Sequence, residues 1–163
     1  MENEKAIGSY QVPLMMLTVI TGFIAGILGS AFCYLAHYFH FTSISPAIIL
    51  APINGVWKQE WLGVTITIIL YGLISIAVAL FYYLLLRKKT SLYWGLAYGI
   101  AIYLVLFMGL PALIAGMKPI YKYDFITILT ELCFFIIYGT FIGFSISYEY
   151  NEQQQLKKTN INQ

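Results

Sequence analysis

Four long stretches of the sequence contain almost no charged residue, and they constrain the fold more than any other feature. They cover residues 14–41, 62–86, 90–117 and 125–148. Fifteen of the sixteen Asp, Glu, Lys and Arg residues lie outside these stretches, and the exception is Glu131. A helix crosses ~30 Å of hydrocarbon in ~20 residues, so each stretch is long enough to span a bilayer. The pattern predicts an all-α, integral membrane four-helix bundle.

The composition agrees with a membrane protein and excludes several other classes. Of the 163 residues, 60% are hydrophobic and 10% are charged, and the mean hydropathy is +0.78. A soluble domain carries ~25% charged residues. The net charge of +2 is too small to indicate a nucleic-acid partner. The two cysteines, Cys33 and Cys133, lie inside apolar stretches and fit neither a disulfide framework nor a zinc site.

The stretches define a single membrane domain with a short segment at each end. We expect a cytoplasmic N-terminal segment over 1–12, the membrane domain over 13–148, and a flexible cytoplasmic tail over 149–163, which is rich in Gln and Asn. The first helix is too long for a signal peptide and is expected to be retained. Pro111 is predicted to end or kink the third helix. The expected helices cover residues 14–38, 62–86, 92–110 and 125–148.

The basic residues predict the orientation in the membrane. With four spans, the two termini and the 87–91 connection share one side, and this side holds six of the nine Lys and Arg residues. The cluster Arg87, Lys88 and Lys89 directly follows the second helix, where the positive-inside rule is most reliable. We therefore expect a multi-pass protein with both termini in the cytoplasm, anchored at this interface by the basic cluster.

The two loops on the opposite side are apolar and contain prolines. Residues 43–61 read SISPAIILAPINGVWKQEW, and residues 110–122 read LPALIAGMKPIYK. Both are too short and too broken to span. We expect two partly buried outer loops that lie along the interface, with Trp57 and Trp61 at headgroup level. Re-entry into the bilayer is the alternative, provided that the bundle shields the loop backbone.

Small residues mark the helix faces that we expect to be in contact, because helices in lipid gain little from burying one apolar side chain against another. Three of the four helices carry a GxxxG spacing. We expect this spacing to pack helices within one chain, and a self-association face is the alternative. The predicted packing residues are Gly22, Gly26, Gly29, Gly72, Gly95, Gly99, Gly139 and Gly143.

A weak internal repeat accompanies this pattern. Gly22, Gly26 and Pro46 each recur as the same residue type at a constant offset of 73. A duplicated two-helix hairpin would produce such an offset, and coincidence among so many glycines is the alternative.

Glu131 is the charged residue that lies inside a predicted helix. It is six residues into the fourth stretch, about 9 Å along the helix axis, where a carboxylate is costly. We therefore expect Glu131 to face the bundle in its neutral form. His37, which lies at a similar depth, and Tyr138, two turns along the same face, are the predicted partners, with a backbone carbonyl as a further choice. The position is compatible with a structural role and with proton sensing or an ion pathway.

No motif points to catalysis. The sequence has no HExxH, GxSxG or Walker loop. His37 and His40 are three residues apart and lack the further ligands that a zinc site needs. We predict that the protein is not an enzyme and binds neither a metal nor a cofactor.

Two segments of the chain form a recognisable pattern. The first outer loop contains Pro46, Pro52 and the pair Trp57-Lys58, and residues 133–149 read CFFIIYGTFIGFSISYE. Together they resemble the YqhR-type conserved membrane proteins of spore-forming Gram-positive bacteria, over nearly the whole chain. The resemblance implies a bacterial plasma-membrane protein. It supplies no activity and no catalytic residue, and Glu131 lies outside its most specific part.

Two classes of function follow from these observations. Our first hypothesis is a non-enzymatic accessory or interaction subunit, because packing surface is abundant and the basic edge can meet anionic lipid. Its partners would be the lipid bilayer and either another membrane protein or a second copy of the chain. The alternative is a small proton-linked channel or transporter centred on Glu131. An enzyme acting on lipid is a distant third.

Overall fold

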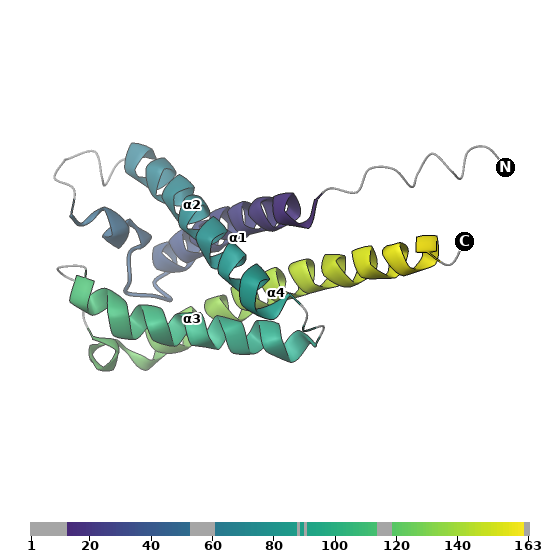
Figure 1. The fold of residues 1–163 in the computed structure, drawn as a ribbon. Helices are drawn as coiled ribbons and strands as arrows, with labels where there is room; N and C mark the ends of the chain where they lie inside the picture. Colours follow the sequence, from purple (N-terminus) through teal and green to yellow (C-terminus); the bar gives the residue numbers. More distant parts are fainter. Residues whose placement is uncertain (1–12, 53–60, 88, 90, 114–118, 162–163) are drawn as a thin grey trace.

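The computed structural model of the protein describes residues 13–52, 61–87, 89, 91–113 and 119–161. The described part contains four long α-helices and two short 3-10 helices, with no strand (Figure 1). The prediction of an all-α protein is therefore confirmed. In chain order the elements are α1 (Leu14–Tyr38), η1 (Pro46–Leu50), α2 (Trp61–Leu86), α3 (Leu92–Leu113), η3 (Ile120–Lys122) and α4 (Phe125–Ile161).

All four α-helices are long and apolar enough to cross a membrane. Many of their large apolar side chains face outward, as Leu84, Val105 and Met108 show with exposed fractions of 72%, 70% and 79%. Small and hydroxyl-bearing residues such as Thr18 and Thr67 are fully buried instead. This arrangement suits a protein whose outer surface contacts lipid.

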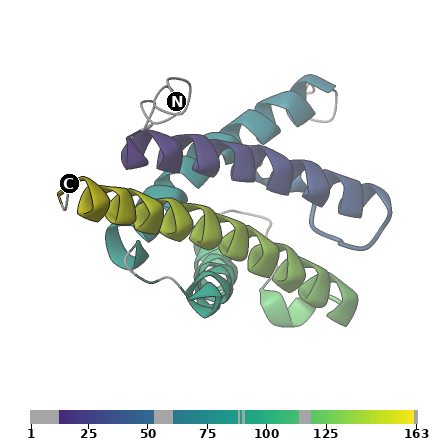
Figure 2. The same cartoon turned by 90° about the vertical axis from the view of Figure 1, so that its right-hand side faces the viewer.

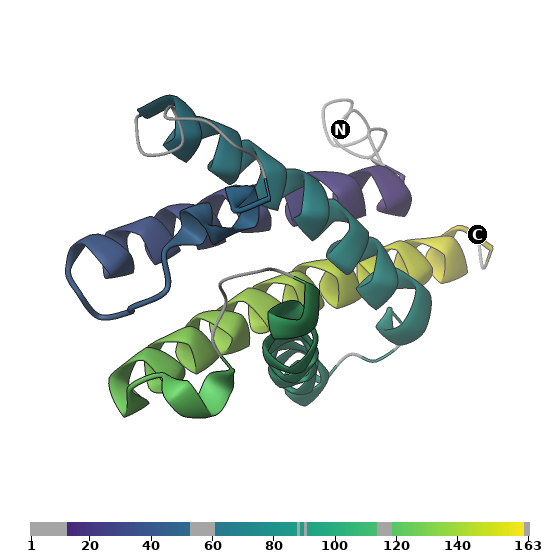
Figure 3. The ribbon, with the colours of Figure 1, turned by 90° about the vertical axis from the view of Figure 1, so that its left-hand side faces the viewer.

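The helices form two hairpins, α1 with α2 and α3 with α4, and α1 also packs antiparallel along α4 (Figures 2 and 3). Glycines permit the close contacts within each hairpin. A Cβ added at Gly26 would lie 2.5 Å from the Ser75 Cβ, and one at Gly99 would collide with the Phe135 carbonyl oxygen. Such contacts replace the hydrophobic driving force that helices lack in lipid.

The remaining predicted glycines lie mostly on the same contact faces. Gly139 and Gly143 of α4 contact α3, and Gly95 of α3 contacts α4. Gly22 of α1 contacts α2, and Gly72 of α2 contacts the Phe23 ring of α1. Gly29 has a looser environment, with Tyr138 at 3.8 Å from an added Cβ. The glycines of the internal repeat lie on the first helix of each hairpin. Gly22 and Gly26 are on α1, and Gly95 and Gly99, 73 residues later, are on α3.

The described parts of the two outer loops cover one end of the bundle. Ile44 and Ile48 of the first loop and Ile120 of the second pack against the buried pair Tyr103 and Phe107. The last residue of η1, Leu50, is fully buried. The prediction of partly buried outer loops is therefore confirmed for these segments.

Two helix ends differ from the predicted ones. The helix expected to end at residue 148 continues to Ile161, where we predicted a flexible tail. Glu, Gln, Leu and Lys in this segment are good helix formers, and Gln153 Nε2 donates to Glu149 Oε1 over 3.0 Å, one turn apart.

The helix expected to end at residue 110 includes Pro111. A proline in the last turn removes a single backbone hydrogen bond, so the turn survives.

Candidate functional site

Glu131 lies inside the bundle and is hydrogen-bonded to a threonine of the first outer loop. Its side chain, on α4, is 6% exposed. The Thr42 hydroxyl, which is also buried, donates to Glu131 Oε1 over 2.8 Å. A hydrogen bond within a protein contributes about 0.5–1.5 kcal/mol net, and leaving a buried polar group without its partner costs about 1–3 kcal/mol. This bond joins the first hairpin to α4.

The conformation at the end of α1 brings Thr42 to this position. His40 has a left-handed φ of 62°. Its N–H donates to the His37 carbonyl over 3.1 Å, and the Phe41 N–H donates to the Ala36 carbonyl over 2.9 Å. This is a Schellman arrangement, which ends a helix abruptly. His37 Nδ1 then donates to the Thr42 carbonyl over 3.1 Å and holds the loop backbone against the helix end.

A second pair of hydrogen bonds lies one helical turn before Glu131. Thr127 Oγ1 accepts the Ser43 N–H over 3.1 Å and donates to Ser43 Oγ over 3.4 Å. Thr42 Oγ1 also accepts the N–H of Ile44 over 3.2 Å. We call Thr42, Ser43, Thr127 and Glu131 the outer latch. The outer latch fastens the first outer loop to α4 at two successive turns.

The hydrogen-bond partner of Glu131 is thus Thr42 rather than His37 or Tyr138. His37 reaches the same network indirectly, through the Thr42 backbone. The Tyr138 hydroxyl lies 2.6 Å from Ser75 Oγ, and Ser75 donates its own proton to the Gly22 carbonyl over 2.5 Å. Tyr138 is therefore the donor to Ser75. The three predicted residues belong to two networks at different depths.

Three further polar groups lie within electrostatic range of the Glu131 carboxyl: Cys33 of α1, Tyr71 of α2 and Tyr103 of α3. The Tyr71 hydroxyl donates to the Pro46 carbonyl over 3.3 Å. In the described ranges, no group of three or more His, Cys, Asp and Glu side chains is arranged to hold a metal ion. The arrangement holds one carboxyl in place, and gain or loss of a proton at Glu131 is the chemistry it offers.

The predicted interface anchors that the structure describes lie at both ends of the bundle. Trp61 is the first residue of α2 and is 73% exposed. At the opposite end, Arg87 Nη1 donates to the Tyr83 hydroxyl over 2.6 Å, and Lys89 Nζ lies 5.0 Å from the centre of the Trp94 ring. The other predicted anchors, Trp57 and Lys88, lie outside the described residues.

Comparison with known proteins places the chain in a family. The family described as conserved membrane protein YqhR matches residues 1–161. The chain belongs to this family. YqhR of Bacillus subtilis (strain 168) is 38% identical over 154 residues, which cover 93% of this chain and 86% of that protein. No solved structure matches the chain.

The resemblance to YqhR-type proteins is therefore confirmed, and the structure gives its most specific segment a physical role. The segment 138–147 is a part of α4 against which both α2 and α3 pack. Gly139 and Gly143 contact α3, and Ser147 is hydrogen-bonded to Tyr82 of α2 over 3.1 Å. In this chain, the YqhR pattern is a packing surface of a multi-pass membrane protein.

The residues that form hydrogen bonds around Glu131 were not predicted from the sequence, although part of the signal was present. Thr127 precedes Glu131 by four residues, a spacing that places both side chains on one face of a helix. Thr42 and Ser43 form a polar pair directly after the end of α1. Their role depends on the left-handed turn at residue 40. Glycine is the usual signal for such a turn, and the histidine found there does not indicate it.

Proposed function

We propose that this protein is a non-enzymatic subunit of the plasma membrane, with both termini in the cytoplasm, that binds another membrane protein or a second copy of itself. The contact element is the C-terminal part of α4, residues 149–161, which we call the α4 arm. The observation that carries the proposal is the length of α4 beyond the bundle.

The helix is too long to be contained in the bilayer. Its 37 residues extend over about 55 Å at 1.5 Å per residue, whereas the hydrocarbon core is ~30 Å thick. The C-terminal end of α4 projects past the other helices (Figure 1). The exposed polar residues of this end include Glu152, Gln154 and Lys158. Leu156 lies between them and has an exposed fraction of 42%. A projecting polar helix that exposes an apolar side chain such as Leu156 is a suitable contact for another helix.

The outer latch supports the same proposal from the other end of the molecule. Glu131 is the residue around which a proton pathway would be built, and its Oε1 already accepts the Thr42 hydroxyl. A carboxyl that closes a loop onto a helix has a structural role without any transported species.

Site-specific photocrosslinking in cells at native expression tests the proposal. A photoreactive amino acid at Gln154 should form a product with one defined protein, identified by mass spectrometry, or with a differently tagged second copy. The same amino acid at Met108, which is 79% exposed on the lipid-facing side of α3, is the matched control and should give no such product. Recovery of monomer alone from the Gln154 position contradicts the proposal.

Reporter fusions test the orientation on which the cytoplasmic arm depends. A reporter that is active only in the cytoplasm should be active when fused to either terminus. Activity at one terminus only would exclude an arrangement with four spans and both termini on one side.

A small proton-linked channel or transporter remains the second candidate, favoured by the burial of the Glu131 carboxyl, which is 6% exposed inside a helix long enough to span the membrane. The variant Glu131→Gln separates the two functions, because Gln keeps an oxygen that accepts the Thr42 hydroxyl but cannot exchange a proton. A transporter should lose its pH-driven flux in reconstituted vesicles, while crosslinking at Gln154 should be unchanged. Flux that is equal in wild type and variant removes this candidate.

A further inference from the structure

The connection between α2 and α3 holds two cationic side chains in fixed positions. Arg87 Nη1 donates to the Tyr83 hydroxyl, and the guanidinium carbon lies 4.7 Å from the Tyr83 ring and 5.8 Å from the ring of Tyr150 on α4. Lys89 Nζ lies 5.0 Å from the Trp94 ring of α3. Cations within about 6 Å of a ring centre are attracted to its face. Rings from three helices therefore restrict where these two charges can go.

Neither cation is neutralised within the described part of the chain. No acidic side chain there forms an ion pair with Arg87 or Lys89. The acidic residue nearest in sequence to Tyr150 is Glu149, and its carboxylate accepts the Gln153 amide one turn along α4. Two ordered positive charges thus remain available to an anion at the membrane surface.

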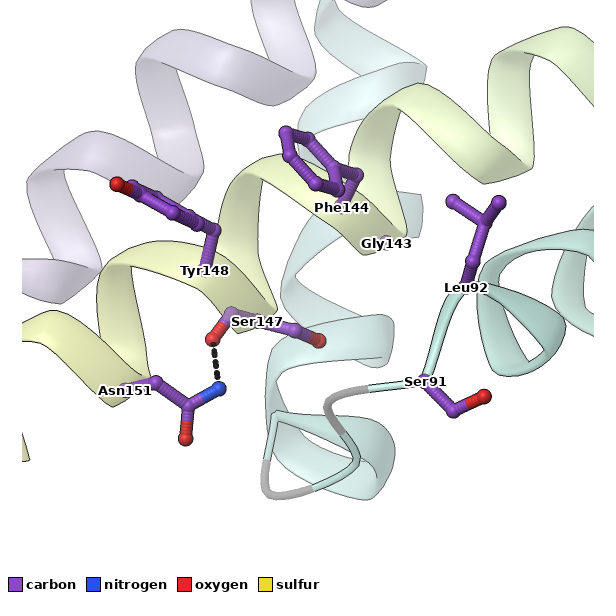
Figure 4. A pocket seen from close by; sticks show the side chains of 7 residues that line it. All are labelled: Ser91, Leu92, Gly143, Phe144, Ser147, Tyr148 and Asn151. Carbon is purple, nitrogen blue, oxygen red and sulfur yellow. Dashed lines mark hydrogen bonds between the residues drawn. The ribbon is translucent and has the colours of Figure 1, made fainter.

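A small hollow lies between the start of α3 and α4, at the same end of the bundle as the connection that carries Arg87 and Lys89 (Figure 4). Its volume is about 90 Å³. Leu92, Phe144 and Tyr148 give it apolar walls that face the lipid side, with Phe144 and Tyr148 each 59% exposed. Ser91, Ser147 and Asn151 add polar groups, with Ser91 only two residues after Lys89. The hollow therefore changes from apolar to polar at the end of the bundle where the basic residues lie.

We propose that this end of the bundle binds the headgroup of an anionic glycerophospholipid. Arg87 and Lys89 contact the phosphodiester, and the glycerol and first acyl carbons occupy the hollow lined by Leu92 and Phe144. Charge complementarity identifies the ligand as anionic, because guanidinium and ammonium groups form their strongest hydrogen bonds with phosphate oxygens. The apolar walls identify a lipid rather than a free phosphate, because only a lipid carries chains that cover them.

Fluorescence quenching of Trp94 by lipids with brominated acyl chains tests this proposal. The protein with Trp57→Phe and Trp61→Phe retains Trp94 as its single tryptophan, and Trp94 lies under Lys89. It is reconstituted in vesicles of brominated phosphatidylglycerol with phosphatidylcholine, and in vesicles with the bromine on phosphatidylcholine instead. We expect phosphatidylglycerol to be preferred at Trp94 by about fivefold for each contributing cation.

Charge variants show whether the preference belongs to this site. Arg87→Gln together with Lys89→Gln should reduce the preference to about one. Lys122→Gln together with Lys158→Gln removes the same charge elsewhere and should leave it unchanged. Lys89→Gln alone gives an intermediate preference and removes no hydrogen bond that the structure shows, so it remains informative if the double variant fails to fold.

Three results would overturn the proposal. The first is equal quenching by the two brominated lipids in the parent protein. The second is a preference that survives in the Arg87→Gln and Lys89→Gln double variant. The third is loss of the preference when millimolar inorganic phosphate or glycerol 3-phosphate is added at constant ionic strength, which would assign the cations to a soluble phosphate.

Discussion

At the scale of single residues, stability in lipid depends on whether each buried polar group has a partner, because no water is present to supply one. Thr42 has a central position in this respect. Its hydroxyl donates to Glu131 and accepts the Ile44 N–H, while its carbonyl accepts from His37. One side chain and its backbone therefore connect a helix end, a loop and a second hairpin.

Replacing Thr42 by Val should destabilise the protein by about 1–3 kcal/mol, because the variant retains the shape but leaves the buried Glu131 carboxyl without its donor. Reversible unfolding in mixed detergent micelles, followed by circular dichroism, measures the change. Thr65→Val is the matched control, since the Thr65 hydroxyl is exposed and donates to the carbonyl one turn before it. Equal stabilities of the two variants would show that the bond between Thr42 and Glu131 contributes nothing.

Replacing His40 by Gly should stabilise the protein by roughly 0.5–1 kcal/mol, because a left-handed φ of 62° strains a residue with a Cβ and suits glycine. The same unfolding measurement detects the gain. Phe39→Gly is the control, since Phe39 has a φ of −81°. Glycine there relieves no strain and should destabilise the protein, through its entropic cost and the loss of the ring contacts with Tyr38 and Phe41. A destabilised His40→Gly variant would mean that the imidazole contributes more than the strain costs.

The single-residue features also show what sequence reasoning can reach. The burial of Glu131 could be predicted, because an isolated carboxyl in an apolar helix must face the protein. Its partner could not, because depth alone favoured His37. The decisive factor is the backbone path after α1, which turns at a histidine where a glycine would be the usual signal.

At the scale of secondary-structure elements, glycine spacing determines which helices approach closely. Gly26 lets α1 meet Ser75 of α2, and Gly99 lets α3 meet the backbone of α4 at Phe135. Both spacings are visible in the sequence. The sequence does not show which helix each glycine faces, because a GxxxG spacing is as compatible with a second copy as with a neighbour in the same chain.

Gly99→Ala should destabilise the protein by about 1–3 kcal/mol, because the new methyl group would collide with the Phe135 carbonyl and force α3 and α4 apart. Gly109→Ala is a sharp control on the same helix. Nothing lies within 4 Å of a Cβ there, so the higher helix propensity of alanine should leave stability unchanged or raise it by up to about 1 kcal/mol. Thermal unfolding in detergent separates the two, and equal values would exclude close packing at Gly99.

Helix ends were harder to predict than helix cores. The apolar pattern stops near Tyr148, and a polar segment rich in Gln and Asn is typical of flexible chain, yet α4 continues to Ile161. Once a helix has a stable nucleus, each further residue adds one hydrogen bond at little cost. The long buried part of α4 supplies that nucleus, which composition alone does not reveal.

At the scale of the whole molecule, two glycine-packed hairpins are joined by hydrogen bonds and by a shared apolar core, which includes Ala25, Tyr82 and Ile142. The outer latch lies at one end, the bond between Tyr138 and Ser75 lies further along α4, and the bond between Ser147 and Tyr82 lies beyond it. Each hairpin has its own glycine contacts, so we expect it to form independently in the bilayer. The hydrogen bonds and the shared core then determine how the two hairpins associate.

Cutting the chain in the connection between α2 and α3 tests this division. Fragments 1–89 and 90–163, co-expressed with different tags, should be recovered together from membranes, because each retains its own glycine contacts. Thr42→Val together with Tyr138→Phe should lower their association by about 1–2 kcal/mol, since bonds between helices in lipid contribute about 0.6 kcal/mol on average and up to ~1.7. That change corresponds to roughly a five- to thirtyfold weaker association.

Gly109→Ala is the control and should leave recovery unchanged, because nothing lies within 4 Å of a Cβ added at Gly109. Fragments that never co-purify, or a double variant that associates as well as wild type, would show that the hairpins are not the units of assembly.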